Sequence, residues 1–240
     1  MRLLVLACLL MLHTSLAAAE LRIASAANFY PTLTKIAETF SAESGDEISI
    51  IRGSTGKLYA QIIRGAPYDL FFSADSARAD KLVAQGHSFN NTSQVYAIGQ
   101  LALWSQQAQS PQQLEKLLHS GSFNKLSIAN PKTAPYGQAA KEALQAMGLY
   151  EKVKHKLVYG ENIAQTLQFV ESGAAELGFV ARSHVNDQVF FAIEQTMHQP
   201  VTQKMLILKQ TKQPALAQRF VEFLQKPAIA EMIKQDGYQL

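Results

Sequence analysis

The stretch ISIIRGSTGKLYAQIIRGAPYDLFF, residues 48–72, decides the fold. It begins with an apolar strand over residues 48–51, passes through a loop of small residues at 53–56, and continues into a helix whose apolar side chains recur on one face of residues 58–63. A second, buried-type strand follows at residues 70–72. Two strands joined by a helix predict a parallel βαβ unit, with the helix packed against the sheet.

The same alternation of strands and helices extends toward both ends of the chain. Further strands are predicted at residues 21–25, 95–98, 101–104, 126–129, 157–159, 177–180 and 205–208. Further helices are predicted between Asn28 and Gly45, at residues 77–85, from Pro111, and at residues 138–147, 163–171, 214–224 and 227–235. Two such series predict an α/β protein of two lobes, each a mixed, mostly parallel sheet flanked by helices.

Two stretches, near residues 96–99 and 203–208, are expected to cross between the lobes as hinge strands. The expected division assigns residues 20–97 and 206–240 to one lobe and residues 98–205 to the other. This layout is typical of hinged binding proteins that close on a ligand.

The first 19 residues are typical of a secretory signal peptide that is removed from the mature chain. Arg2 precedes an apolar run at residues 3–12, and small residues at 17–19 precede the expected cleavage site. An exported, periplasmic protein is therefore expected. The only cysteine, Cys8, lies inside this segment, so a mature chain without thiols excludes cysteine catalysis, Cys-ligated zinc and disulfides.

Composition excludes other classes of function. The chain has 240 residues, 48% of them apolar and 17% charged, with a net charge of +3 and no basic run. Phosphate-backbone binding requires clustered Lys and Arg, so nucleic acid is not an expected partner. The Gly-Ser-Thr-Gly-Lys run at residues 53–57 lacks the spacing of a P-loop, and a Gly-x-Ser-x-Gly elbow is missing.

Two carboxylates near one strand could in principle act as an acid–base pair. Asp69 and Asp75 flank the strand at residues 70–72. The favoured interpretation is structural, with each carboxylate accepting hydrogen bonds from loop N–H groups. The histidines show no metal-ligand spacing, so neither an enzyme nor a resident metal or cofactor is expected.

Four loops each lead from a predicted strand into the start of a helix: residues 26–28, 53–56, 134–137 and 160–163. Helix N-termini carry free N–H groups and the positive end of the helix dipole, which favour anions. Singly, Asn28, Ser54, Thr55 and Asn162 are favoured helix caps. Together, at the carboxyl ends of parallel strands, the loops predict a pocket for a small oxyanion held by neutral donors.

The sequence also resembles the periplasmic molybdate-binding protein family over residues 20–240. The resemblance is carried by GSTGKLYAQI (53–62) with GAPYDLFFSAD (65–75), by NPKTAPYG (130–137), and by GENIAQTLQFVESGAAELGFV (160–180). It implies a type II periplasmic-binding-protein fold that captures molybdate or tungstate and delivers the ion to the permease subunits of an ABC importer. A monomer is expected, with molybdenum or tungsten bound only as the oxyanion.

The resemblance also implies the contact residues. The first loop would contribute Asn28 and the backbone at Ala27, the second Thr55 with Ser54, the third the Tyr136 hydroxyl and the fourth the Ile163 backbone N–H. Many members have a hydroxyl side chain in the first loop, which Ala26 and Ala27 lack. Asn28 is therefore expected to provide a side-chain donor there. Ala181 stands where some members have a tyrosine.

Two alternatives remain open from the sequence. One is a receptor for sulfate, phosphate or ferric ion on the same fold, although ferric ion needs anionic ligands that these loops lack. The other is a periplasmic enzyme acting on phosphorylated or sulfated substrates, which would need a nucleophile–base pair or a metal cluster.

Overall fold

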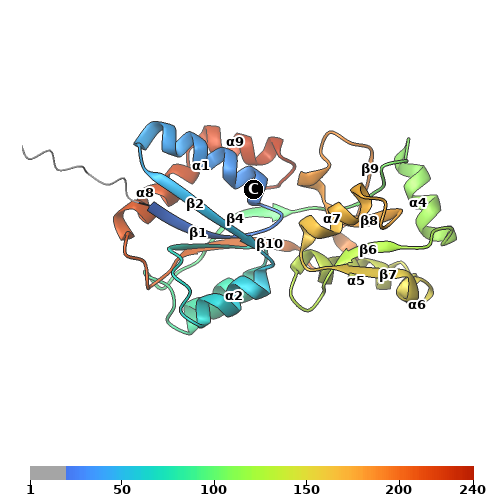
Figure 1. Ribbon diagram of the computed structural model, residues 1–240, viewed down its shortest axis with the longest axis horizontal. Helices are drawn as coiled ribbons and strands as arrows, with labels where there is room; N and C mark the ends of the chain where they lie inside the picture. Colours follow the sequence, from blue (N-terminus) through green and yellow to red (C-terminus); the bar gives the residue numbers. More distant parts are fainter. Residues whose placement is uncertain (1–19) are drawn as a thin grey trace, which may run out of the picture.

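The computed structural model describes residues 20–240, so the signal peptide predicted for residues 1–19 lies outside the described residues. Two lobes lie side by side, each built on one five-stranded sheet (Figure 1). Both sheets contain parallel and antiparallel strand pairs and carry helices on both faces. This confirms the predicted two-lobe α/β fold.

The first sheet combines strands from both ends of the chain. Its order is β2 (Glu47–Gly53), β1 (Glu20–Ala26), β3 (Leu70–Ser73), β10 (Val201–Ile207) and β4 (Gln94–Gly99). β1 pairs in parallel with β2 and β3, whereas β10 is antiparallel to both of its neighbours. One face carries α1 (Tyr30–Ser44), α8 (Pro214–Leu224) and α9 (Pro227–Gln235), and the other carries α2 (Thr55–Ile63) and α3 (Ser76–Ala84).

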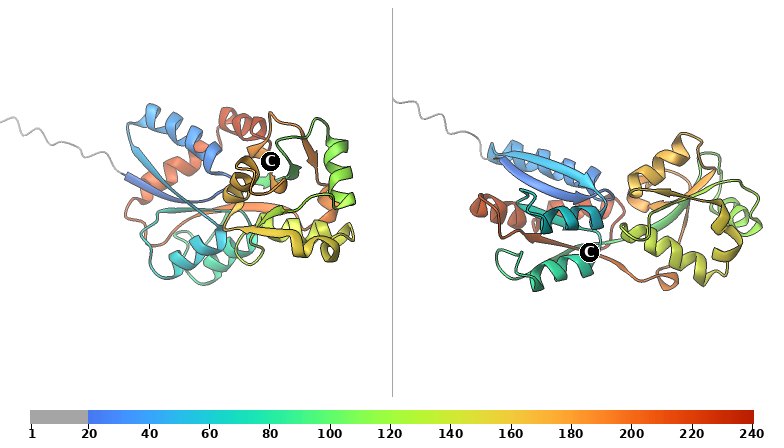
Figure 2. Two further views of the ribbon diagram at one scale, coloured as in Figure 1. Left: turned by 45° about the vertical axis from the view of Figure 1, so that its right-hand side comes forward. Right: turned by 60° about the horizontal axis from the view of Figure 1, so that its bottom comes forward.

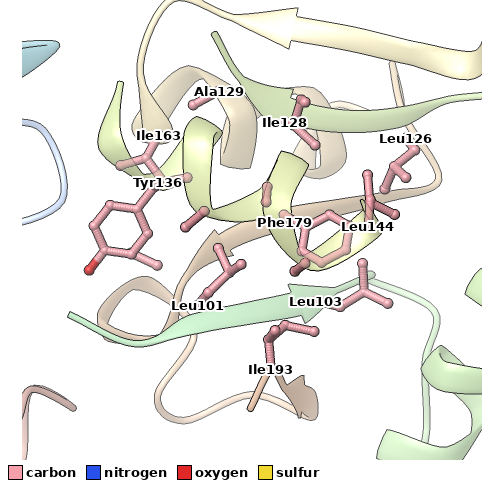
Figure 3. Packing of buried hydrophobic residues seen from close by; sticks show 14 of the residues in the cluster. Leu101, Leu103, Leu126, Ile128, Ala129, Tyr136, Leu144, Ile163, Phe179 and Ile193 are labelled. Atoms are coloured by element: carbon pink, nitrogen blue, oxygen red, sulfur yellow. The ribbon is translucent and has the colours of Figure 1, made fainter. Parts of the chain in front are cut away.

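The second sheet uses only the middle of the chain. Its order is β7 (Leu157–Gly160), β6 (Leu126–Ala129), β8 (Leu177–Ala181), β5 (Leu101–Trp104) and β9 (Phe190–Ala192). One face packs against α4 (Pro111–Ser120), α5 (Pro135–Ala146) and α6 (Tyr150–Val153), and the other against α7 (Ile163–Glu171). Figure 3 shows the first of these two cores, in which Leu144 of α5 lies against Phe179 of β8.

Within the part of the chain that the structure describes, three short 3₁₀ helices complete the elements: η1 (Lys154–Lys156), η2 (Arg182–His184) and η3 (Gln195–Met197). No helix within residues 20–240 is both long and apolar enough to cross a membrane.

The chain passes between the sheets twice. Gln100 separates β4 from β5, and residues 193–200 lead from β9 back to β10. Both β4 and β10 pair within the first sheet, and the two connections run close together between the lobes (Figure 2). The division of the lobes at residues 97/98 and 205/206 stays a prediction.

Helix α1 illustrates how the sequence produces an element. Pro31 stands in its first turn, where the missing N–H is tolerated, and Gly45 ends it with the left-handed φ of 77° that glycine adopts without strain. Leu33, Ile36 and Phe40 recur at helical spacing and are at most 4% exposed. Each contributes about 1.5–3 kcal/mol by burial, so Leu33→Ala would cost about 2–5 kcal/mol.

The structure corrects several predicted boundaries. Helix α5 begins at Pro135 rather than residue 138, because Pro135 can occupy the first turn of the helix. Strand β10 begins at Val201 rather than residue 205, and β9 and α6 were not predicted. Asn28 does not cap α1, since Phe29 occupies the N-cap position.

Candidate functional site

The four predicted loops meet between the lobes. In the first sheet Ala26 pairs with Gly53, and in the second Ala129 pairs with Gly160, so the loops leave the carboxyl ends of parallel strands. One pocket is lined by residues from all four loops: Ala26, Ala27, Asn28, Gly53, Ser54, Thr55, Ala74, Ala134, Pro135, Tyr136, Asn162 and Ile163. The structure thus brings together all six residues proposed from the sequence.

The pocket is small. About 210 Å³ of space free of protein atoms lies between its walls, a volume that includes open solvent. Only a small ligand can be accommodated among these residues. Ala181, where some relatives have tyrosine, is buried in the second lobe's core and does not line the pocket.

In the first loop, most donors already have partners. The Ala27 N–H donates to the Gly53 oxygen at 3.0 Å. The Asn28 amide nitrogen donates to Gln203 Oε1 at 2.7 Å and to Tyr238 Oη at 3.3 Å. Within residues 20–240 the main-chain N–H of Asn28 has no partner, so the main chain is the available donor here, rather than the Asn28 side chain.

The second loop offers two hydroxyl groups. Ser54 occupies the N-cap position of α2, yet its hydroxyl makes no capping bond. Its Oγ is buried and has no hydrogen-bond partner among the described residues. Thr55 Oγ1 accepts from the Ala74 N–H at 3.1 Å, which leaves the hydroxyl proton free to donate. Because a buried polar group without a partner is costly, Ser54 is a candidate ligand donor rather than a cap.

Tyr136 contributes a second orphaned hydroxyl. Its ring belongs to the apolar core of the second lobe, and Figure 3 shows its hydroxyl directed away from Leu144 and Phe179. This oxygen is buried and has no hydrogen-bond partner in the described part of the chain. Burial raises the pKa of Tyr136 well above its usual value, so the group stays protonated and can donate.

In the fourth loop, one residue caps the helix and the next is the candidate ligand donor. Asn162 caps α7, because its Oδ1 accepts from the Ala164 and Gln165 N–H groups at 3.0 and 3.1 Å. The Ile163 N–H is not engaged by this cap, and Ile163 lines the pocket. The cap interpretation therefore holds for Asn162, while the Ile163 backbone remains a candidate donor.

Electrostatically, the pocket is built from neutral donors. None of its lining residues carries a charged side chain. The first residues of α2, α5 and α7 line it, so the positive ends of three helix dipoles lie at the pocket. Such a site stabilises an anion without supplying or removing a proton, because a carboxylate or histidine is missing from its lining.

The lobes are in contact around this pocket. The Gly56 N–H donates to the Thr133 oxygen at 2.8 Å, and Arg78 Nη2 donates to the Lys132 oxygen at 3.2 Å. Lys57 Nζ and Glu161 Oε1 form an ion pair at 2.8 Å across the rim.

A histidine adds a further contact between the lobes. His184 Nε2 lies 3.1 Å from the main-chain oxygen of Asn28. Burial lowers the pKa of His184 to about 4, so the neutral ring donates this bond.

The paired carboxylates have the predicted structural roles. Asp69 Oδ2 accepts from the Arg22 N–H at 2.8 Å and its Oδ1 accepts from Thr211 Oγ1 at 2.6 Å. Asp75 caps α3 by accepting from the Arg78 N–H at 2.8 Å. Among residues 20–240, no group of three or more acidic, histidine or cysteine side chains could hold a metal ion.

Sequence reasoning missed Gln203. It is fully buried on β10, where Val201, Gln203 and Met205 alternate inward. A polar residue at an inward position, between apolar inward residues, could have identified Gln203 from the sequence as a buried group that needs polar partners.

Two lobes with a small pocket of uncharged donors between them are typical of a solute-binding protein, which holds a small molecule without transforming it. The chain belongs to the bacterial extracellular solute-binding protein family, whose profile matches residues 21–239. It is therefore a binding protein rather than an enzyme, as expected from the sequence.

Comparison with relatives confirms the resemblance. The chain is 40% identical over 229 residues to molybdate-binding protein ModA of Azotobacter vinelandii, covering 93% of this chain and 91% of the relative. It is 35% identical over 225 residues to molybdate-binding protein ModA of Rhodobacter capsulatus, covering 92% and 89%. The solved periplasmic molybdate-binding protein of Azotobacter vinelandii matches with a TM-score of 0.88 at 34% identity, covering 92% of this chain and 99% of that one.

Proposed function

We propose that this protein captures molybdate, and also tungstate, between its two lobes and delivers the ion to the permease subunits of an ABC importer. The protein would act in the periplasm as a monomer, after removal of residues 1–19. Two observations support the proposal: the convergence of neutral donors from both lobes on one small pocket, and the relatives named as molybdate-binding proteins.

The strongest support comes from the hydroxyl groups of Ser54 and Tyr136. Each is buried without a hydrogen-bond partner among the described residues, and the two come from different lobes. A bound oxyanion would accept from both. The other proposed donors are the Thr55 hydroxyl and the main-chain N–H groups of Asn28 and Ile163, whereas the Ala27 N–H already donates to Gly53.

Closure follows from this division of the donors. Neither lobe alone can surround the ion, so the closed state binds more tightly than an open one and is favoured when the ion is present. The contacts of Gly56 with Thr133 and of Lys57 with Glu161 would belong to this closed state. The closed form would be the one that docks on the permease.

The pocket's chemistry selects among anions. A singly protonated phosphate carries an O–H donor that needs an acceptor, and the lining residues have no carboxylate to provide one. Sulfate needs no acceptor but is smaller than molybdate, so some donors would remain unsatisfied, at about 1–3 kcal/mol each. The pocket therefore favours a larger tetrahedral dianion without a proton.

Isothermal titration calorimetry of the mature protein, stripped of anions, tests the proposal. Molybdate, tungstate, sulfate and phosphate are titrated in turn. Tight one-to-one binding of molybdate and tungstate, with sulfate and phosphate silent, is expected. Preferential binding of sulfate or phosphate would contradict the assignment of molybdate as the ligand. No heat with any of the four anions would contradict the assignment of the pocket as an oxyanion site.

A further inference from the structure

A buried glutamine lies behind the pocket. Gln203 is fully buried on β10, beside a β-bulge where Tyr96 is the extra residue of the neighbouring strand β4. Bulges redirect side chains, and this one lets Tyr96 Oη donate to Gln203 Oε1 at 2.8 Å. The same oxygen accepts from Asn28 Nδ2 at 2.7 Å. One end of the Gln203 amide is thus fully engaged.

The orientation of that amide follows from its neighbours. Tyr238 Oη donates its single proton to the main-chain oxygen of Asn28 at 2.7 Å, so toward the Asn28 side chain it can only accept. The Asn28 atom 3.3 Å from Tyr238 Oη is therefore Nδ2. Because Nδ2 also donates to Gln203, Gln203 must present Oε1 on that side and Nε2 on the other.

On its other side, Gln203 faces Tyr136. A Cβ atom at Gly99 would lie 2.8 Å from Gln203 Nε2 and would overlap the Tyr136 hydroxyl, so both groups pack against Gly99. Both are buried and neither makes a well-formed hydrogen bond among residues 20–240, but an interaction with the Gln203 side chain is one of the influences that lower the pKa of Tyr136. Nε2 can only donate, whereas a tyrosine oxygen can accept and donate at once.

We propose that Gln203 is a positioning residue of the anion pocket, whose Nε2 donates to Tyr136 Oη when the anion is bound and thereby directs the Tyr136 proton toward the anion. The inference rests on the proposed function and adds to it a residue that does not line the pocket. A hydroxyl that accepts a hydrogen bond becomes a stronger donor. The amide nitrogen of Gln203 cannot itself accept the Tyr136 proton.

The proposed bond also links the lobes. Gln203 belongs to the first sheet, and Tyr136 belongs to α5 on the second. Gly99 keeps the approach open, because any side chain there would separate the two groups. The Tyr136 donor would therefore be correctly aimed only when the lobes have come together.

A double-mutant cycle tests the proposal. Molybdate affinity is measured by calorimetry for the wild type, Gln203→Met, Tyr136→Phe and the double variant, with Gln94→Met on β4 as the matched control. Each single substitution in the pair is expected to raise Kd about tenfold, the scale of one hydrogen bond to a charged group. The double variant should bind no more weakly than Tyr136→Phe, because Gln203 acts through Tyr136. Gln94→Met should leave Kd unchanged.

The results distinguish the two hypotheses. If Gln203→Met costs as much in the Tyr136→Phe background as in the wild type, Gln203 is only structural and the inference is wrong. If the wild type itself does not bind molybdate, the proposed function fails and the inference with it. Gln203→Glu should bind at least 100-fold more weakly, because its carboxylate would accept the Tyr136 proton and repel a dianion; near-normal affinity would contradict the mechanism.

A second measurement needs no variant at position 203 to fold. In protein labelled with ¹⁵N-glutamine, one buried side-chain NH₂ resonance is expected to shift when molybdate is added to the wild type and to stay unshifted in Tyr136→Phe. The same shift in both proteins would show that the Gln203 amide does not sense the anion through Tyr136.

Discussion

Replacing Gly56 with alanine should weaken anion binding without destabilising the anion-free protein. Gly56 lies in the first turn of α2, and its N–H donates to the Thr133 oxygen of the other lobe at 2.8 Å. A Cβ atom added there would lie 3.0 Å from that oxygen, 3.1 Å from Thr133 Cα and 3.3 Å from Arg78 Nη2. The substitution therefore crowds the closed state at the point where the lobes touch.

The size of the effect follows from these distances. Unstrained heavy-atom contacts to carbon lie near 3.5–4.0 Å, so the new methyl group must push its neighbours aside. Crowding of this kind costs about 1–3 kcal/mol. In a state with the lobes apart both Thr133 contacts are lost and only the flexible end of the Arg78 side chain, on α3 of the same lobe, stays near the new methyl group. Alanine also favours the helix over glycine by up to about 1 kcal/mol. Because about 1.4 kcal/mol is tenfold in affinity, Kd for molybdate should rise about 5- to 100-fold.

Calorimetry and thermal unfolding together check this expectation. Gly56→Ala should raise Kd while leaving the unfolding temperature of the anion-free protein equal or slightly higher. Ala60→Gly, in the same helix but away from the pocket, is the matched control. It should lower the unfolding temperature through helix propensity and leave Kd unchanged. Unchanged affinity in Gly56→Ala would refute the assignment of the Thr133 contact to the closed state.

Three further changes test other parts of the site. Thr55→Ala removes a hydroxyl donor and the acceptor of the Ala74 N–H, so calorimetry should show a Kd for molybdate about 5- to 100-fold higher; unchanged affinity would remove Thr55 from the site. Burial lowers the pKa of His184 to about 4 in the folded protein. As pH falls, the His184 ring is therefore protonated in the unfolded chain before it is protonated in the folded one. Native stability should therefore fall from pH 6.5 to 4 by up to about 3 kcal/mol, and denaturant unfolding of His184→Gln should lack that loss. The Lys57–Glu161 pair is about half exposed, so Lys57→Met should change Kd less than about fivefold; a larger change by calorimetry would mean that this pair controls closure.

The fold was predictable where local patterns are long and periodic. The helices at residues 163–171, 214–224 and 227–235 have the predicted bounds, because their apolar faces and start signals are contained in their own sequence. Strand β9 and helix α6 are too short to show a period. Strand β10 was predicted to start late, because Gln203 interrupts its apolar alternation at an inward position.

The candidate site was predictable as a place but not as a set of donor atoms. Loops at strand ends could be grouped from the order of elements alone, and all six residues do meet at one pocket. Whether a given donor is free depends on partners far away in the chain. The Asn28 amide is engaged by Gln203 and Tyr238, which follow it by 175 and 210 residues. No local pattern around Asn28 contains that information.

The position of β10 in the first sheet also constrains the order of folding. This strand lies between β3 and β4, so the early strands of the first lobe cannot form a continuous sheet until residues 201–207 have joined them. The second sheet needs only residues 101–192, which are contiguous in the chain. Closing a short loop is faster than closing a long one, so the second lobe can fold first. Once folded, it holds the N-terminal and C-terminal segments of the first lobe close together and so lowers the entropic cost of pairing β10 with β3 and β4.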